Sequence, residues 1–130
     1  MLNSVFAVGG IVTAPHHLAT DTGQLVLRSG GNAVEAMIAM AATIAVVYPH
    51  MNAIGGDSFW IVKPAGKKPI GIDACGAAAS GATDDLYSQA GFSEIPNRGY
   101  LAANTVAGTL SGCHVALAIA RMLGGSKSRE

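Results

Sequence analysis

Residues 33 to about 47 restrict how this chain can fold more than any other stretch, because they combine a helix start signal with an almost wholly apolar composition. Asn32 and Glu35 have the spacing of a capping box, in which Asn32 accepts from the amide of residue 35 and the Glu side chain reaches back. Apart from Glu35 and Thr43 the predicted helix is apolar all round, a pattern typical of a helix buried on nearly every side. Tyr48 and Pro49 end it. The fold must therefore cover this helix with other elements.

Those other elements are predicted on both sides of the helix. Apolar periodicity, β-branched runs and glycine or proline stops indicate where they begin and end. They are a strand starting near Ile11 after Gly9 and Gly10, a helix over residues 17–28 closed by residues 29–31, hairpin strands over residues 58–63 and 69–73, a short helical turn at 84–90 in an otherwise irregular stretch, and a helix from about 106 to 123. Helices and a hairpin together predict an α/β (α+β) fold class.

The charge content is low for a free-standing domain. Half of the residues are apolar and only 12% are charged, whereas soluble domains average about 25% charged. This predicts that the chain buries much of its surface against another polypeptide or belongs to a longer one. The eight basic and eight acidic side chains cancel, so there is no net field to attract nucleic acid or an anionic bilayer.

The apolar stretches also bear on the compartment. Residues 36–47 would span about 18 Å as a helix, well short of a hydrocarbon core of about 30 Å, which predicts a core helix and no membrane span. Residues 1–12 lack a secretory signal pattern. Cys75 and Cys113 lie far apart in the chain without Cys-x-x-Cys spacing, and a reducing compartment would keep them as thiols. We therefore expect a cytoplasmic protein.

Few side chains suggest chemistry on their own. His16 and His17 are adjacent, but no Asp, Glu or Cys lies at ligand spacing, so no metal site is predicted. Cys75 would act as a nucleophile only if the fold brought His50 or His114 beside it, and a small buried thiol is the commoner outcome. Neither the Gly-x-Gly-x-x-Gly nor the Walker pattern occurs. No cofactor is predicted.

The loop over residues 50–57 is the candidate pocket loop. It carries Asn52, Gly55, Gly56 and Asp57 between an apolar helix and a strand, which is more than a connection needs. Paired glycines allow backbone conformations or close approaches that other residues do not. The loop is therefore either a structural connection or the lining of a neighbouring site.

Three segments form a pattern more specific than any one of them alone: residues 13–19 (TAPHHLA), 30–36 (GGNAVEA) and 46–60 (VVYPHMNAIGGDSFW). In this order and spacing they resemble the start of the large subunit of the γ-glutamyltransferase family, also known as γ-glutamyltranspeptidases or glutathione hydrolases. A fourth, residues 104–109 (NTVAGT), resembles the family segment that opens its next helix. The resemblance covers about residues 7–124.

The resemblance implies an N-terminal-nucleophile hydrolase with a four-layer αββα sandwich. In this family a precursor cleaves itself, the new N-terminal Thr of the small subunit attacks an amide carbonyl, and water or an amino acceptor resolves the acyl-enzyme. The oxyanion donors also belong to the small subunit. None of the threonines of this chain lies in the matching context. Residues 1–130 are therefore expected to be an N-terminal large-subunit fragment, an incomplete domain with no catalytic residue, whose partners are the remaining segments of the precursor.

One departure from the family pattern concerns the substrate. Family members recognise the substrate α-carboxylate with an Arg just after the second hairpin strand, and that position falls on Cys75 or Ala77 here. Neither side chain replaces a guanidinium–carboxylate contact. Residues 98–105 (RGYLAANT) are similar to a cytoplasmic branch that includes oxamate amidohydrolase.

Three functions follow from these observations. The first is part of an enzyme that hydrolyses or transfers the acyl group of a γ-glutamyl amide. The alternatives are an oxamate-type or other acylase specificity, and a non-catalytic binding or assembly module.

Overall fold

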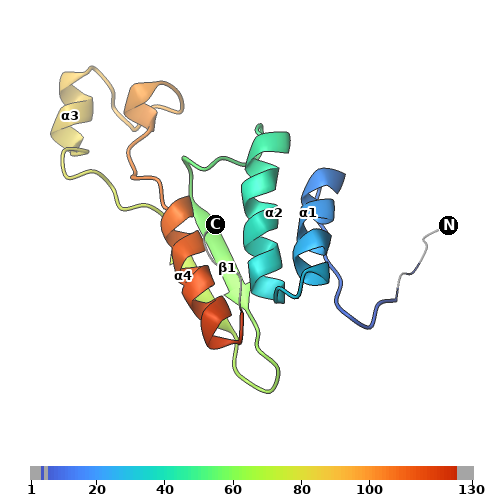
Figure 1. Cartoon of the computed structure of the whole chain (residues 1–130). Coiled ribbons are helices and arrows are strands. Elements are labelled where there is room, and N and C mark those ends of the chain that lie inside the picture. Colours follow the sequence, from blue (N-terminus) through green and yellow to red (C-terminus); the bar gives the residue numbers. More distant parts are fainter. Residues whose placement is uncertain (1–3, 5, 126–130) are drawn as a thin grey trace.

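The computed structural model describes residue 4 and residues 6–125. Helix α1 packs against α2, α2 packs against α4, and α4 packs on the two-stranded hairpin, while α3 and the 3-10 helix η1 project away from this body (Figure 1). The elements are α1 (His17–Arg28), α2 (Ala33–Val47), β1 (Ser58–Val62), β2 (Ile70–Ala74), α3 (Asp84–Gln89), η1 (Tyr100–Ala102) and α4 (Thr109–Met122).

The predicted capping box at the start of α2 is confirmed. Asn32 Oδ1 accepts hydrogen bonds from the amides of Val34 and Glu35, each 3.0 Å long, and the Asn32 amide donates to Glu35 Oε2 at 2.7 Å. Asn32 Nδ2 also donates to the Ala120 carbonyl at 2.9 Å. This one side chain therefore starts α2 and fastens it to the end of α4.

The hairpin separates a buried face from an exposed one. β1 and β2 are antiparallel, with Ser58 opposite Ala74 and Val62 opposite Ile70. Successive side chains alternate between the faces, so Trp60 and Val62 pack in the core against helices α2 and α4. The other residues of this core are Val34, Ala116, Ile119 and Ala120.

The outward face of the hairpin is apolar. Phe59 is 69% exposed and Ile61 is 84% exposed on the side of β1 away from the helices. Large apolar side chains are exposed elsewhere too, including Leu110 and Met122 on α4. Contiguous exposed apolar surface usually marks an interaction site, which agrees with the low charge content.

Two predictions about burial and pairing were wrong. No strand forms near Ile11, because the sheet consists of β1 and β2 alone in the part of the chain that the structure describes. Helix α2 is not buried on nearly every side, since Met37 is half exposed and Val46 is mostly exposed. Helix α1 and the α4–hairpin layer cover only part of its surface. The other predicted elements lie within three residues of the observed bounds.

Residues 79–104 form a small arm. Its two ends meet at the bridge between Ala78 and Thr105 and at the hydrogen bond from the Ala79 amide to the Asn104 carbonyl, 2.9 Å long. None of the helices in the described part of the chain has the length and apolar character that a membrane span requires.

The exposed hairpin face gives a first prediction. The polypeptide of residues 1–130 on its own should self-associate and bind the dye ANS, because Phe59 and Ile61 face solvent. Replacing both with serine should lower ANS fluorescence and light scattering, whereas serine at Lys67 and Lys68 in the hairpin turn should not. A wild-type polypeptide that is monomeric, melts cooperatively and ignores ANS would contradict this expectation.

Candidate functional site

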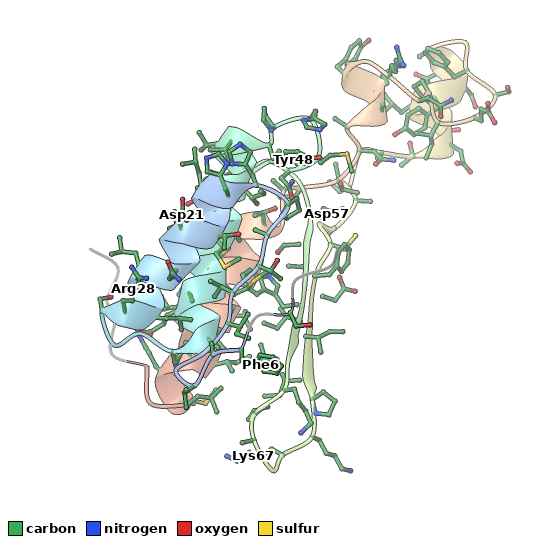
Figure 2. The ribbon with its side chains drawn as sticks, turned by 90° about the vertical axis from the view of Figure 1, so that its right-hand side faces the viewer. Phe6, Asp21, Arg28, Tyr48, Asp57 and Lys67 are labelled. Atoms are coloured by element: carbon green, nitrogen blue, oxygen red, sulfur yellow. The ribbon has the colours of Figure 1, made fainter. Side chains whose placement is uncertain are left out.

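Three segments meet at one end of the hairpin. Asp57 precedes β1 and Cys75 follows β2, and the antiparallel register places them side by side because Ser58 pairs with Ala74. Asp57 lies at the end of the hairpin opposite the turn that carries Lys67 (Figure 2). The start of α4 is the third segment.

The loop over residues 50–57 is fastened to α4 through one carbonyl. The Gly56 carbonyl accepts from the Gly108 amide at 3.0 Å, the Thr109 amide at 3.0 Å and the Thr109 hydroxyl at 2.8 Å. Gly108, the N-cap of α4, has no side chain to satisfy the free amides of the first turn. A loop carbonyl takes that role, so the loop and the helix hold each other in place.

Thr109 is a site residue that the sequence interpretation missed. Its hydroxyl reaches the carbonyls of Gly56, Asp57 at 3.1 Å and Ala53 at 3.4 Å. The available signal was a threonine directly after a glycine at a predicted helix start. Nothing in the sequence pairs it with a loop more than fifty residues earlier.

Asp57 and Cys75, two of the predicted site residues, are brought together. Asp57 Oδ1 accepts from the Gly76 amide at 3.2 Å, and the Cys75 thiol donates to Asp57 Oδ2 at 3.8 Å. Asp73 Oδ1 accepts from the Cys75 amide at 2.9 Å. Two carboxylates therefore flank position 75.

Two open hollows adjoin this contact. The first, about 400 Å³, is lined by Asn52, Gly56 and Asp57 of the predicted loop together with His50 and Thr109. The second, about 380 Å³, is lined by Cys75, Gly76 and Ala77 and by the start of α4. Gly55 lines neither hollow. Asp57 thus lies on the boundary between them.

The expectation that Gly55 and Gly56 allow an unusual backbone conformation or a close approach was wrong. Neither Gly55 nor Gly56 has a positive φ, and a methyl group on either would meet no atom closer than 3.8 Å. Close backbone approaches occur instead at Gly76 and Gly108, where an added methyl group would overlap the carbonyls of Val106 and Ala74. Loop 50–57 contributes its carbonyl groups and Asp57. The positions where only glycine fits, Gly76 and Gly108, lie in the two segments packed beside the loop.

The hypothesis of a Cys75 nucleophile is not supported by these contacts. The thiol is exposed and bonds to Asp57 and to the Gly76 carbonyl at 3.9 Å. The negative charge of Asp57, followed by desolvation and the charge of Asp73, raises the pKa of Cys75. Since the thiolate is the nucleophile, this environment suppresses reactivity. Cys113 is half-buried, and burial raises the pKa of its thiol too.

A second prediction concerns the pH dependence of Cys75. A raised pKa leaves a smaller fraction of Cys75 as thiolate at neutral pH. This difference from an unperturbed thiol disappears as the pH rises above the pKa of Cys75 in the folded protein. Alkylation of Cys75 by iodoacetamide at pH 8 should therefore be slower than in an unfolded peptide of residues 73–77. Added salt should narrow the gap because it screens the carboxylates. A rate equal to that of the peptide at every pH would contradict the assignment.

His16 and His17 have structural roles at the start of α1. His16 Nδ1 accepts from the Leu18 amide at 3.2 Å, and the two imidazole rings stack with their centroids 4.6 Å apart. Over residue 4 and residues 6–125, no three His, Cys, Asp or Glu side chains are grouped so as to hold a metal ion.

Comparison with known proteins decides the family. Residues 19–119 match the family described as Gamma-glutamyltranspeptidase. The chain belongs to the γ-glutamyltranspeptidase family. The predicted resemblance is thereby confirmed.

The fold of γ-glutamyltranspeptidases is confirmed by solved structures. The crystal structure of Helicobacter pylori γ-glutamyltranspeptidase superposes with a TM-score of 0.81 at 30% identity, over 97% of this chain and 36% of that one. The helices and hairpin are therefore part of an N-terminal-nucleophile hydrolase fold.

Two curated relatives of this γ-glutamyltranspeptidase-family chain are named proenzymes. Oxamate amidohydrolase proenzyme of Klebsiella pneumoniae is 55% identical over 125 residues, which are 96% of this chain and 23% of that protein. A glutathione hydrolase-like proenzyme of Bacillus subtilis is 41% identical over 109 residues, 83% of this chain and 20% of that protein. The chain thus spans less than a quarter of the length of either relative.

Proposed function

We propose that this chain is the N-terminal part of the large subunit of an amidohydrolase whose nucleophilic threonine lies outside residues 1–130. The relatives that it matches are named proenzymes and are more than four times as long as the matching region. Several threonine hydroxyls of the chain have structural hydrogen bonds, for example Thr22 to the Leu18 carbonyl and Thr43 to the Ala39 carbonyl. The chain would supply a wall of the pocket, and the remaining segments of the precursor would supply the nucleophile and the oxyanion donors.

The proposed substrate is a small amide of the oxamate type. The observation that supports this choice is the surroundings of position 75, which with Ala77 is one of the two candidate positions for the family's Arg toward the γ-glutamyl α-carboxylate. Here Asp57 and Asp73 flank a thiol, and the described lining of the two hollows includes no Lys or Arg. A charge-assisted bond to a carboxylate stabilises by roughly 1.5–3 kcal/mol, and this site offers none.

Oxamate does not place the same demand on position 75. Its carboxylate is bonded directly to the reactive amide carbon, so the anion stays beside the nucleophile. The α-carboxylate of a γ-glutamyl compound lies at the far end of a three-carbon chain and would need a cation there. The 55% identity to an oxamate amidohydrolase supports the same choice.

A γ-glutamyl substrate is the second candidate, because glutathione hydrolases are among the relatives, as in the 36% identical proenzyme of Pseudomonas sp.. The proposed compartment is the cytoplasm. Two unpaired thiols, Cys75 and Cys113, support a reducing environment.

The experiment is a comparison of two substrates on the mature full-length enzyme. We expect kcat/KM for oxamate to exceed that for γ-glutamyl-p-nitroanilide by at least about tenfold, the size of one missing charge-assisted bond. Activity on the γ-glutamyl compound with none on oxamate would overturn the substrate proposal. A self-processed protein without activity on any amide would instead favour the binding module.

A further inference from the structure

Asp57 is held in one place by its neighbours. Its own carbonyl accepts from the Thr109 hydroxyl at 3.1 Å, and its side chain accepts from the Gly76 amide at 3.2 Å. The preceding Gly56 carbonyl accepts three hydrogen bonds from the start of α4. The carboxylate is exposed to solvent but its backbone is tied to two other segments.

Position 75 is fixed just as tightly. The Val106 amide donates to the Ala77 carbonyl at 2.9 Å, and Gly76 packs its backbone directly on the Val106 carbonyl. Asp73 accepts from the Cys75 amide. The side chain at position 75 therefore projects from a rigid frame with a carboxylate oxygen of Asp57 3.8 Å from its sulfur.

The charge at this point is unbalanced. Asp57 lines one hollow and contacts the residue that lines the other, so its field reaches both. The lining of the two hollows, as far as the structure describes it, holds one further charged side chain, Asp73, and one imidazole, His50. A carboxylate on a ligand that entered here would face one or two negative charges within several ångströms.

We propose that Asp57 is a specificity-determining residue, whose fixed carboxylate excludes amides that carry an anionic group at the position-75 end of the pocket. This inference rests on the proposed amidohydrolase function. The site would then select against such amides by repulsion from the negative charge of Asp57, in addition to lacking an Arg that could bind them. An Arg introduced at position 75 would then pair with Asp57 and would not be available to a substrate.

The first test measures how the negative charge of Asp57 affects the alkylation of the Cys75 thiol. In the native full-length enzyme, Cys75 is alkylated with anionic iodoacetate and with neutral iodoacetamide, and the two rates are compared for wild type, Asp57→Asn and Asp21→Asn. Asparagine keeps an oxygen for the Gly76 amide, and Asp21 is an exposed acid on α1 (Figure 2) that serves as the matched control. Taking the ratio of the two rates cancels any change in the fraction of thiolate.

The iodoacetate to iodoacetamide ratio should rise about tenfold in Asp57→Asn, the effect of removing one charge several ångströms away between protein and water. It should stay unchanged in Asp21→Asn. An unchanged ratio in Asp57→Asn overturns the proposal whatever the substrate. Failure of both reagents to reach Cys75 also overturns it, because the proposal requires position 75 to face a solvent-filled pocket.

The second test measures the substrate specificity of two variants. Cys75→Arg and the double variant Cys75→Arg/Asp57→Asn are assayed with γ-glutamyl-p-nitroanilide after self-processing is verified. The double variant should gain at least about tenfold in kcat/KM over Cys75→Arg. Equal values in the two variants overturn the role of Asp57. A wild-type enzyme that already prefers the γ-glutamyl compound refutes the proposed function instead, and the alkylation ratio still reports whether the charge acts.

Discussion

Replacing Gly76 with alanine is expected to abolish the accumulation of folded, processed enzyme. An added methyl group would overlap the Val106 carbonyl oxygen, which is a backbone atom and cannot move aside by a change of rotamer. Relief would require residues 75–77 to separate from residues 105–108, which breaks the hydrogen bond between Val106 and Ala77 and withdraws Gly76 from Asp57. Overpacking commonly costs about 1–3 kcal/mol, and a clash between backbones falls at or above the top of that range.

The measurement is the yield of soluble, self-cleaved protein from the full-length gene, with Gly81→Ala as the matched control. Gly81 has open space around it and no positive φ, so alanine there should leave the yield unchanged. Normal yield and activity for Gly76→Ala would show that the observed approach of the two segments is incorrect.

The second large effect is expected for Asn32→Ala. Alanine removes the two capping bonds at the start of α2 and the bond to the Ala120 carbonyl. Loss of an N-cap costs about 0.5–2 kcal/mol and a side-chain bond about 1 kcal/mol, so the sum is about 1.5–3 kcal/mol. Hydrogen exchange of the α2 amides should accelerate roughly 10- to 150-fold if they exchange by local opening.

Asn97→Ala is the control for this measurement, because Asn97 is exposed on the arm. In the Asn97→Ala variant, the amides of α2 should exchange at the wild-type rate. If Asn32→Ala also exchanged at the wild-type rate, the capping box would not contribute to the stability of α2.

Much of the secondary structure was predictable because its signals are local. The capping box marks the start of α2, Gly30 with a positive φ follows α1, and Gly124 with a positive φ follows α4. The apolar run over residues 59–62, followed by Pro64 and Gly66, marks β1 and the turn after it. The strand expected near Ile11 had the right residues but needed a neighbouring strand, and strand pairing is not encoded locally.

The candidate site was predictable in its parts but not in its contacts. Cys75 and Asp57 were each singled out, yet their meeting depends on the hairpin register, which pairs Ser58 with Ala74. A shift of one residue would have turned each side chain to the other face. Thr109 escaped notice because its partners lie more than fifty residues earlier in the chain. The low charge content, by contrast, agrees with the exposed apolar face of β1.

The central claim is that this chain forms a wall of an amidohydrolase pocket while a threonine elsewhere in the precursor attacks the substrate. The most direct measurement is the mass of each polypeptide of the mature enzyme after acid quenching during turnover of an amide. The account predicts an acyl group on the polypeptide that begins with the newly exposed threonine and none within residues 1–130. An acyl group on any residue of this chain, Cys75 above all, would contradict it.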